Sequence, residues 1–259
     1  MKKISLPQII TILVTIITIT VNGLANALPL NGQATGEISD RFDIYFVPAG
    51  YVFSIWGVIY LGLVAFAVHQ ALPAQKDSPL LKKIYPAYWI GNLANALWIF
   101  LWHYEVFALT WVAMVTILAT LIYIYIQISK EGLSLDVNQK WFFKLPFSIY
   151  LGWISVATVA NFSQVLFFYG WEGWGISPAT WAVIMIGVAS VLGLLMQWRV
   201  KDIPYRWVVL WGFVGVFQSQ AGKALVAKTA WAGSGVLILR LFGVYLLLRW
   251  VKEGGEYDD

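Results

Sequence analysis

Eight apolar stretches constrain the fold of this chain more than any other feature. A transmembrane helix needs about 20 consecutive, mainly apolar residues. A chain of 259 residues that is 60% apolar and only 12% charged cannot bury all of its apolar surface in one soluble core. We therefore predict an all-α integral membrane protein with about eight transmembrane helices, at residues 6–27, 48–70, 85–103, 106–127, 145–169, 177–197, 205–222 and 233–250.

The placement of the basic residues tests this topology independently. Cytoplasmic loops of membrane proteins are enriched in Lys and Arg. If the eight helices alternate in direction, 13 of the 17 basic residues fall on the side of the N-terminus, while Glu37, Asp43 and Glu172 fall on the other side. We therefore expect a plasma or inner membrane protein with both termini in the cytoplasm. The longest outer loop, residues 28–47, is expected to fold over the outer surface as a lid.

The composition and the absence of motifs also exclude several functions. The chain has no cysteine, which excludes disulfides, thiolate metal sites and cysteine nucleophiles. No catalytic Ser/His/Asp set, paired carboxylates, P-loop or dinucleotide fingerprint is present, and His69 and His103 fall on opposite predicted sides of the membrane. The net charge of +4 is too small to indicate nucleic-acid binding. We expect no enzymatic activity, no metal site, no required cofactor and no nucleic-acid partner.

Tryptophan and asparagine recur at helical spacing inside several predicted helices. Side chains three or four residues apart share one face of a helix. An amide in lipid is costly without a partner, so these faces are expected to point into the bundle. The residues are Trp56 and Tyr60 in the second helix, Asn92, Asn95, Trp98 and Trp102 in the third, and Trp153, Ala157 and Asn161 in the fifth.

Two interpretations of these stripes stay open. In the first, the amides join neighbouring helices and the indoles fill space, as in a membrane scaffold without a ligand. In the second, the stripes converge on an apolar cavity with a few orienting hydrogen bonds, which is typical of a small-molecule site. Indole rings suit a flat, conjugated ligand, because they can stack on its faces.

Several segments resemble the TspO/MBR family, the translocator protein or tryptophan-rich sensory protein group. The second predicted helix carries the pattern Pro48-Ala49-Gly50-Tyr51-Val52-Phe53, followed by Trp56 and Tyr60. The third has Asn95 and Trp98 in the spacing N-x-x-W. The fifth keeps the family spacing Y-x-x-W-x-x-x-A-x-x-x-N with Tyr150, Trp153, Ala157 and Asn161.

The resemblance implies a sensor-like or receptor-like bundle that binds a hydrophobic small molecule, such as a porphyrin or haem-type tetrapyrrole or a sterol. Carried over position by position, the implied ligand-binding residues are Trp56, Asn95, Trp98, Trp153 and Ala157. Trp98 and Trp153 would stack on the ligand, Asn95 would hydrogen-bond it, and Ala157 would leave room for it. Further ligand or structural candidates are Tyr60, Asn92, Asn161 and Arg240.

The resemblance covers about residues 1–169, the five helices of the TspO-like bundle. Residues 170–259 are expected to add three more transmembrane helices and a short cytoplasmic tail. Within them, Arg240 meets an acidic group of the ligand, meets the C-terminus of a helix, or extends its charge to the headgroups. A homodimer in the bilayer is compatible with the sequence. The alternative function is a secondary transporter of a neutral or lipophilic solute, with pseudo-symmetry between the second and third and the sixth and seventh helices.

Overall fold

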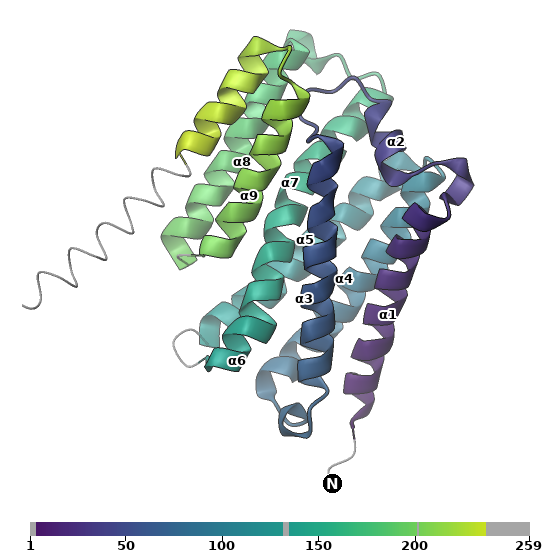
Figure 1. Ribbon diagram of the computed structural model, residues 1–259, viewed down its shortest axis with the longest axis vertical. Coiled ribbons are helices and arrows are strands. Elements are labelled where there is room, and N and C mark those ends of the chain that lie inside the picture. Colours follow the sequence, from purple (N-terminus) through teal and green to yellow (C-terminus); the bar gives the residue numbers. More distant parts are fainter. Residues whose placement is uncertain (1–3, 132–134, 201, 237–259) are drawn as a thin grey trace, which may run out of the picture.

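The computed structural model describes residues 4–131, 135–200 and 202–236, and this part of the chain is helical and contains no β-strand (Figure 1). Short helical turns join the longer helices at Leu30–Gly32, Gly50–Ser54, Pro73–Gln75 and Gly173–Gly175. The longer helices are α1 (Leu6–Ala27), α3 (Ile55–Gln70), α4 (Pro79–His103), α5 (Phe107–Glu131), α7 (Leu145–Phe168), α8 (Pro178–Val200) and α9 (Ile203–Ser219), followed by a helical segment at 224–236. Two short helices are α2 (Thr35–Asp40) and α6 (Val137–Gln139), and a π-helical segment, Lys140–Lys144, leads into α7.

Four helical stretches of the described chain are long and apolar enough to cross a membrane. They are Leu6–Ala27, Gly50–Gln70, Phe107–Lys130 and Val137–Phe168. α4 is also long, but Asn92, Asn95 and its Tyr and Trp residues lower its mean hydropathy. α9 has only 17 residues. The described part of the chain is therefore all-helical, with four stretches that could span a membrane, whereas the expected number of eight spans remains a prediction.

The observed helix ends follow local sequence signals. The side chain of Ser78 accepts a hydrogen bond from the backbone N–H of Leu81, and Pro79 occupies the first turn, so α4 begins six residues before the predicted start at residue 85. The last described helix begins at residue 224, nine residues before the predicted start at residue 233. The predicted range leaves Lys228 outside the helix. In the structure Lys228 lies on the exposed face of this helix, where a charged side chain does not interrupt it.

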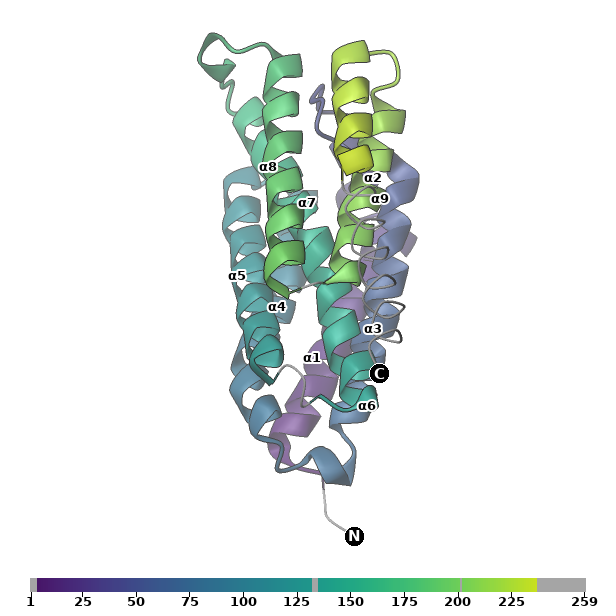
Figure 2. The same cartoon turned by 90° about the vertical axis from the view of Figure 1, so that its left-hand side faces the viewer.

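The helices form one packed body with a short helix across one end. α4 packs against α1 and α5, α7 packs against α5, and α9 packs against both α7 and α8. Figure 2 shows α5 and α8 on one side of the body and α3 and α9 on the other. α2 lies beside the end of α4, and we call this end of the bundle the lid end. Contacts between α7 and α9 cross the predicted domain boundary at residues 169 and 170, which itself stays a prediction.

A ladder of polar side chains joins α1 to α4. Thr15 Oγ1 lies 2.6 Å from the Tyr88 hydroxyl, and Thr18 Oγ1 donates to the backbone oxygen of Asn92 at 3.1 Å. Asn22 Nδ2 donates to Asn95 Oδ1 at 2.7 Å. The fourth contact is the bond from Trp89 Nε1 to Thr11 Oγ1 at 2.9 Å. Because lipid offers no competing partners, such bonds hold the two helices in a fixed register.

A buried carboxylate fixes the beginning of α9. Asp202 is 1% exposed and accepts hydrogen bonds from the hydroxyls of Tyr125 on α5 and Ser148 on α7. Its Oδ1 also accepts from the backbone N–H of Tyr205 at 2.9 Å, which caps the helix. Asp202 lies between the predicted helices 177–197 and 205–222, and in the structure it joins α5, α7 and α9.

We expect Asp202→Ala to lower the free energy of unfolding by about 3 kcal/mol, because it leaves buried hydroxyls of two helices without an acceptor. The matched control is Asp40→Ala, since Asp40 is exposed and should change stability by less than about 0.5 kcal/mol. Unfolding in mixed micelles, followed by circular dichroism, measures both. Equal stability of the two variants would contradict the role of Asp202.

Candidate functional site

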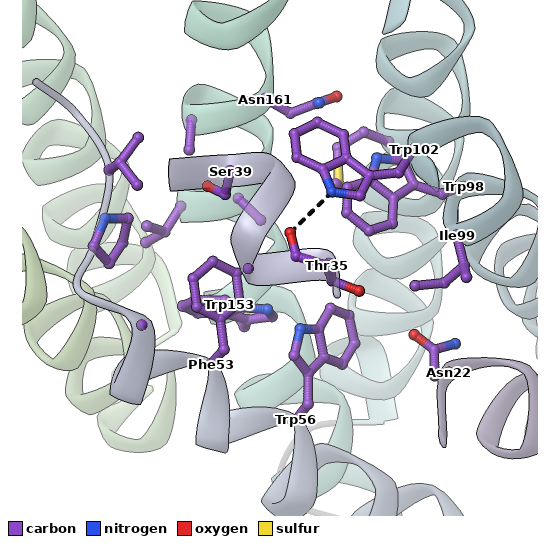
Figure 3. A pocket seen from close by; sticks show the side chains of 18 of the residues that line it. Asn22, Thr35, Ser39, Phe53, Trp56, Trp98, Ile99, Trp102, Trp153 and Asn161 are labelled. Atoms are coloured by element: carbon purple, nitrogen blue, oxygen red, sulfur yellow. Dashed lines mark hydrogen bonds between the residues drawn. The ribbon is translucent and has the colours of Figure 1, made fainter. Parts of the chain in front are cut away.

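A cavity of about 330 Å³ lies at the lid end of the bundle, between α1, α3, α4 and α7 and beneath α2 (Figure 3). Small-molecule sites usually measure about 300–1,000 Å³, so the cavity is near the lower end of that range. The residues that line it are Asn22, Asn26, Thr35, Gly36, Ser39, Val47, Pro48, Gly50, Phe53, Trp56, Tyr60, Trp98, Ile99, Trp102, Met114, Trp153, Val156, Ala157, Ala160, Asn161 and Gln164.

Aromatic rings from three helices and the turn before α3 form much of the wall. Trp98 stacks on Trp102 of the same helix, with ring centroids 5.1 Å apart and planes 16° apart. Across the cavity, Trp153 of α7 meets Phe53 and Trp56 edge to face, at centroid distances of 5.7 and 6.3 Å. These mutual contacts hold the rings in place before any ligand is present.

Two of these indoles carry hydrogen-bond donors that are not used within the described chain. Nε1 of Trp98 and Nε1 of Trp153 are both buried, and neither has a hydrogen-bond partner. By contrast, Trp102 Nε1 donates to the backbone oxygen of Thr35 at 3.1 Å. A buried donor without an acceptor costs roughly 1–3 kcal/mol. Both Nε1 atoms are covered by protein, so an acceptor on a bound molecule would reach them only after lining side chains move.

α2 covers the cavity and is attached to the bundle at several points, as expected for a lid. The bond from Trp102 to Thr35 holds its first residue. Gln164 Nε2 of α7 donates to Ser39 Oγ at 3.0 Å. After the helix, the side chain of Arg41 forms an ion pair with Glu105 at 2.8 Å. The lid is therefore attached to both α4 and α7, and its residues Thr35, Gly36 and Ser39 face the cavity.

No charged side chain lines the cavity in the part of the chain that the structure describes. The lining contains amides and hydroxyls but no Lys, Arg, Asp or Glu side chain. The charged groups at this end lie on the rim, where the hydrogen bond from Arg41 lowers the pKa of the Glu105 carboxyl below its usual value. An ionised group would lose its hydration in such a cavity without gaining a counter-ion.

Comparison with known proteins identifies the family. A family model described as TSPO-like protein matches residues 8–243. The chain belongs to the TSPO-like family. Its membership indicates an integral membrane protein of the sensor or receptor type. Searches of curated proteins and of solved structures gave no match to the chain. The family match runs beyond residue 169 and includes α8 and α9, which the five-helix resemblance did not cover.

In this TSPO-like protein, most of the predicted ligand-binding residues meet at the cavity. Trp56 comes from α3, Trp98 from α4, and Trp153 and Ala157 from α7. Two further candidates, Tyr60 and Asn161, also line it. Asn161 additionally donates to Thr110 Oγ1 of α5 at 3.1 Å and so joins α7 to its neighbour.

The structure places Asn95 and Asn92 away from the cavity. Asn95 is 3% exposed, accepts from Asn22 Nδ2, and donates through its own Nδ2 to the Tyr150 hydroxyl at 2.7 Å. The Asn92 side chain donates to the backbone oxygen of Tyr88 in the same helix, and only the backbone oxygen of Asn92 accepts from Thr18 of α1. Asn95 joins α4 to Asn22 of α1, which lines the cavity, and to Tyr150 of α7. Its role in the structure is therefore to hold the wall of the cavity.

Several residues that line the cavity, among them Ser39 and Gln164, were not predicted from the sequence. Ser39 of the lid carried no recognisable signal, because nothing in its segment indicates what it packs against. Gln164 could have been found, since it follows Ala157 by seven residues and Asn161 by three, which places all three on one face of α7. Arg240 lies outside the described residues. Among the described residues, no cluster of His, Asp or Glu is suited to a metal ion.

We expect Asn95→Ala to lower the free energy of unfolding by about 2 kcal/mol, because Asn22 and Tyr150 each lose a buried partner. Asn26→Ala is the matched control. Asn26 is exposed on α1 and bonds only to the backbone oxygen of Asn22 in its own helix. Unfolding in mixed micelles should show little change in stability for Asn26→Ala. An equal loss of stability in both variants would argue against the role of Asn95 in joining α1, α4 and α7.

Proposed function

We propose that this TSPO-like protein is a non-enzymatic receptor for a flat, hydrophobic molecule, and that the ligand occupies the cavity beneath α2. A porphyrin or another tetrapyrrole is the favoured ligand class, and a sterol-like molecule is the second. The observation that carries the proposal is the pair of unused indole donors of Trp98 and Trp153, set in a wall of aromatic rings. Such a wall favours an aromatic ring system that bears hydrogen-bond acceptors.

The neutral lining of the cavity indicates which part of the ligand it would hold. With no charged side chain among the described lining residues, the ring system of the ligand occupies the cavity and any ionised group stays at the rim. A cavity of about 330 Å³ also leaves little free room, so a large ligand displaces the lid or some lining side chains. Ala157 is then a position at which a larger side chain competes directly with the ligand.

The proposed membrane topology has eight spans, with both termini in the cytoplasm and the lid on the outer side. It rests on the basic residues of the loops between α3 and α4 and between α5 and α7, which lie at the end of the bundle opposite the lid. In this topology the cavity opens toward the outer surface of a plasma or inner membrane.

A titration with protoporphyrin IX tests the binding site. The protein is held in lipid nanodiscs, and binding is followed by the absorption of the porphyrin, so that loss of a tryptophan leaves the readout unchanged. We expect saturable binding that weakens about tenfold in Ala157→Leu, equivalent to about 1.4 kcal/mol. Trp153→Phe removes one indole donor and keeps a ring, so it should weaken binding several-fold.

Each variant has a matched control. Ala119→Leu adds the same side chain on an exposed position of α5, and Trp174→Phe makes the same change at a residue that is 85% exposed. Neither control position lines the cavity. Linear, unsaturable uptake of the porphyrin by all five proteins would mean partitioning into lipid and would reject the proposal.

A further inference from the structure

α9 supplies hydrogen-bond partners to the segment between the lid and α3, residues 47–52, which begins irregular and enters the short helical turn Gly50–Ser54. Ser219 Oγ donates to the backbone oxygen of Val47 at 2.6 Å. The backbone N–H of Ala49 donates to the backbone oxygen of Gly215 at 3.1 Å. Trp211 Nε1 donates to the backbone oxygen of Val52 at 3.0 Å. Three backbone groups of this segment therefore depend on one helix.

The three partners form one stripe of α9, because Trp211, Gly215 and Ser219 are spaced by four residues. The stripe also permits a close approach. A methyl group at Gly215 would overlap the side chain of Val52 and lie 3.0 Å from Cβ of Pro48. Val52 is fully buried, so its side chain has no free space into which to move. Glycine is thus required at position 215 for the segment to lie where it does.

The segment held by this stripe is part of the cavity wall. Val47, Pro48 and Gly50 line the cavity, and Phe53, which follows directly, meets Trp153 edge to face. α9 itself contributes no residue to the lining. It therefore contacts the back of a wall whose front faces the cavity.

We propose that the stripe Trp211, Gly215 and Ser219 positions this wall and thereby sets which ligand the cavity accepts. The inference rests on the proposed function, in that it assumes a ligand in the cavity. It assigns a role to α9, which lies outside the five-helix bundle predicted from the sequence. The three residues are positioning residues, since none of them touches the space that a ligand would fill.

The substitution Gly215→Ala tests the inference. It pushes Pro48 and Val52 toward the cavity, so we expect the affinity for protoporphyrin IX in nanodiscs to fall at least tenfold. The matched control is Gly187→Ala in α8, where an added methyl group meets nothing within 4 Å. The control should bind within twofold of the unchanged protein. Should Gly215→Ala fail to fold, Trp211→Phe replaces it, because this change removes the bond to Val52 but keeps a ring.

A second readout needs no ligand. The chain has no cysteine, so Val47→Cys introduces a single thiol on the segment, at a position that is 8% exposed. We expect a water-soluble maleimide to label this thiol several-fold faster with Gly215→Ala than with Gly187→Ala. The same comparison with Ser39→Cys, on the lid, shows whether the change is confined to the segment.

The two readouts separate the two proposals. Weaker binding together with faster labelling at position 47 supports the positioning role. Equal labelling in the two glycine variants overturns it, as does faster labelling with unchanged affinity. If the unchanged protein does not bind protoporphyrin IX saturably, the proposed function fails, and the labelling rates alone decide whether α9 positions the segment.

Discussion

The architecture depends on the rule that polar backbone groups buried in a membrane protein need partners inside the protein. Most of the chain satisfies this rule by being helical. The stretch from the lid to α3 is not helical throughout, and it satisfies the rule by bonding to α9. This irregular stretch joins α2 to the turn before α3 and forms part of the cavity wall. α9, which lies beyond the predicted five-helix bundle, therefore helps to hold that wall in place.

The sequence alone predicted the helices well, because length and hydropathy are local properties. α1 spans Leu6–Ala27, the predicted range. The period of the helix also predicted which faces turn inward, so Trp56, Trp98, Trp153 and Ala157 meet at one cavity. The motif spacing of the TspO/MBR resemblance agrees with the family match over residues 8–243.

The depth of a residue along its helix and the identity of its partners could not be predicted. Asn95 and Trp98 lie three residues apart on the same side of α4, yet one bonds to α1 and the other faces the cavity. The role of Asp202 could not be predicted, because nothing local shows that Tyr125 and Ser148 lie beside it. The spacing of Trp211, Gly215 and Ser219 was visible, but its meaning required the segment that packs against it.

The ladder between α1 and α4 has a consequence for the direction in which a ligand can travel. The cavity adjoins its last rung, at Asn22, while Thr11, Thr15 and Thr18 bond to α4 farther from the lid. A molecule passing between α1 and α4 would have to break these buried bonds where no water can replace them. The ladder therefore closes the contact between α1 and α4 on the side of the cavity that faces away from the lid. In the proposed receptor, a ligand is then expected to enter and leave at the lid end.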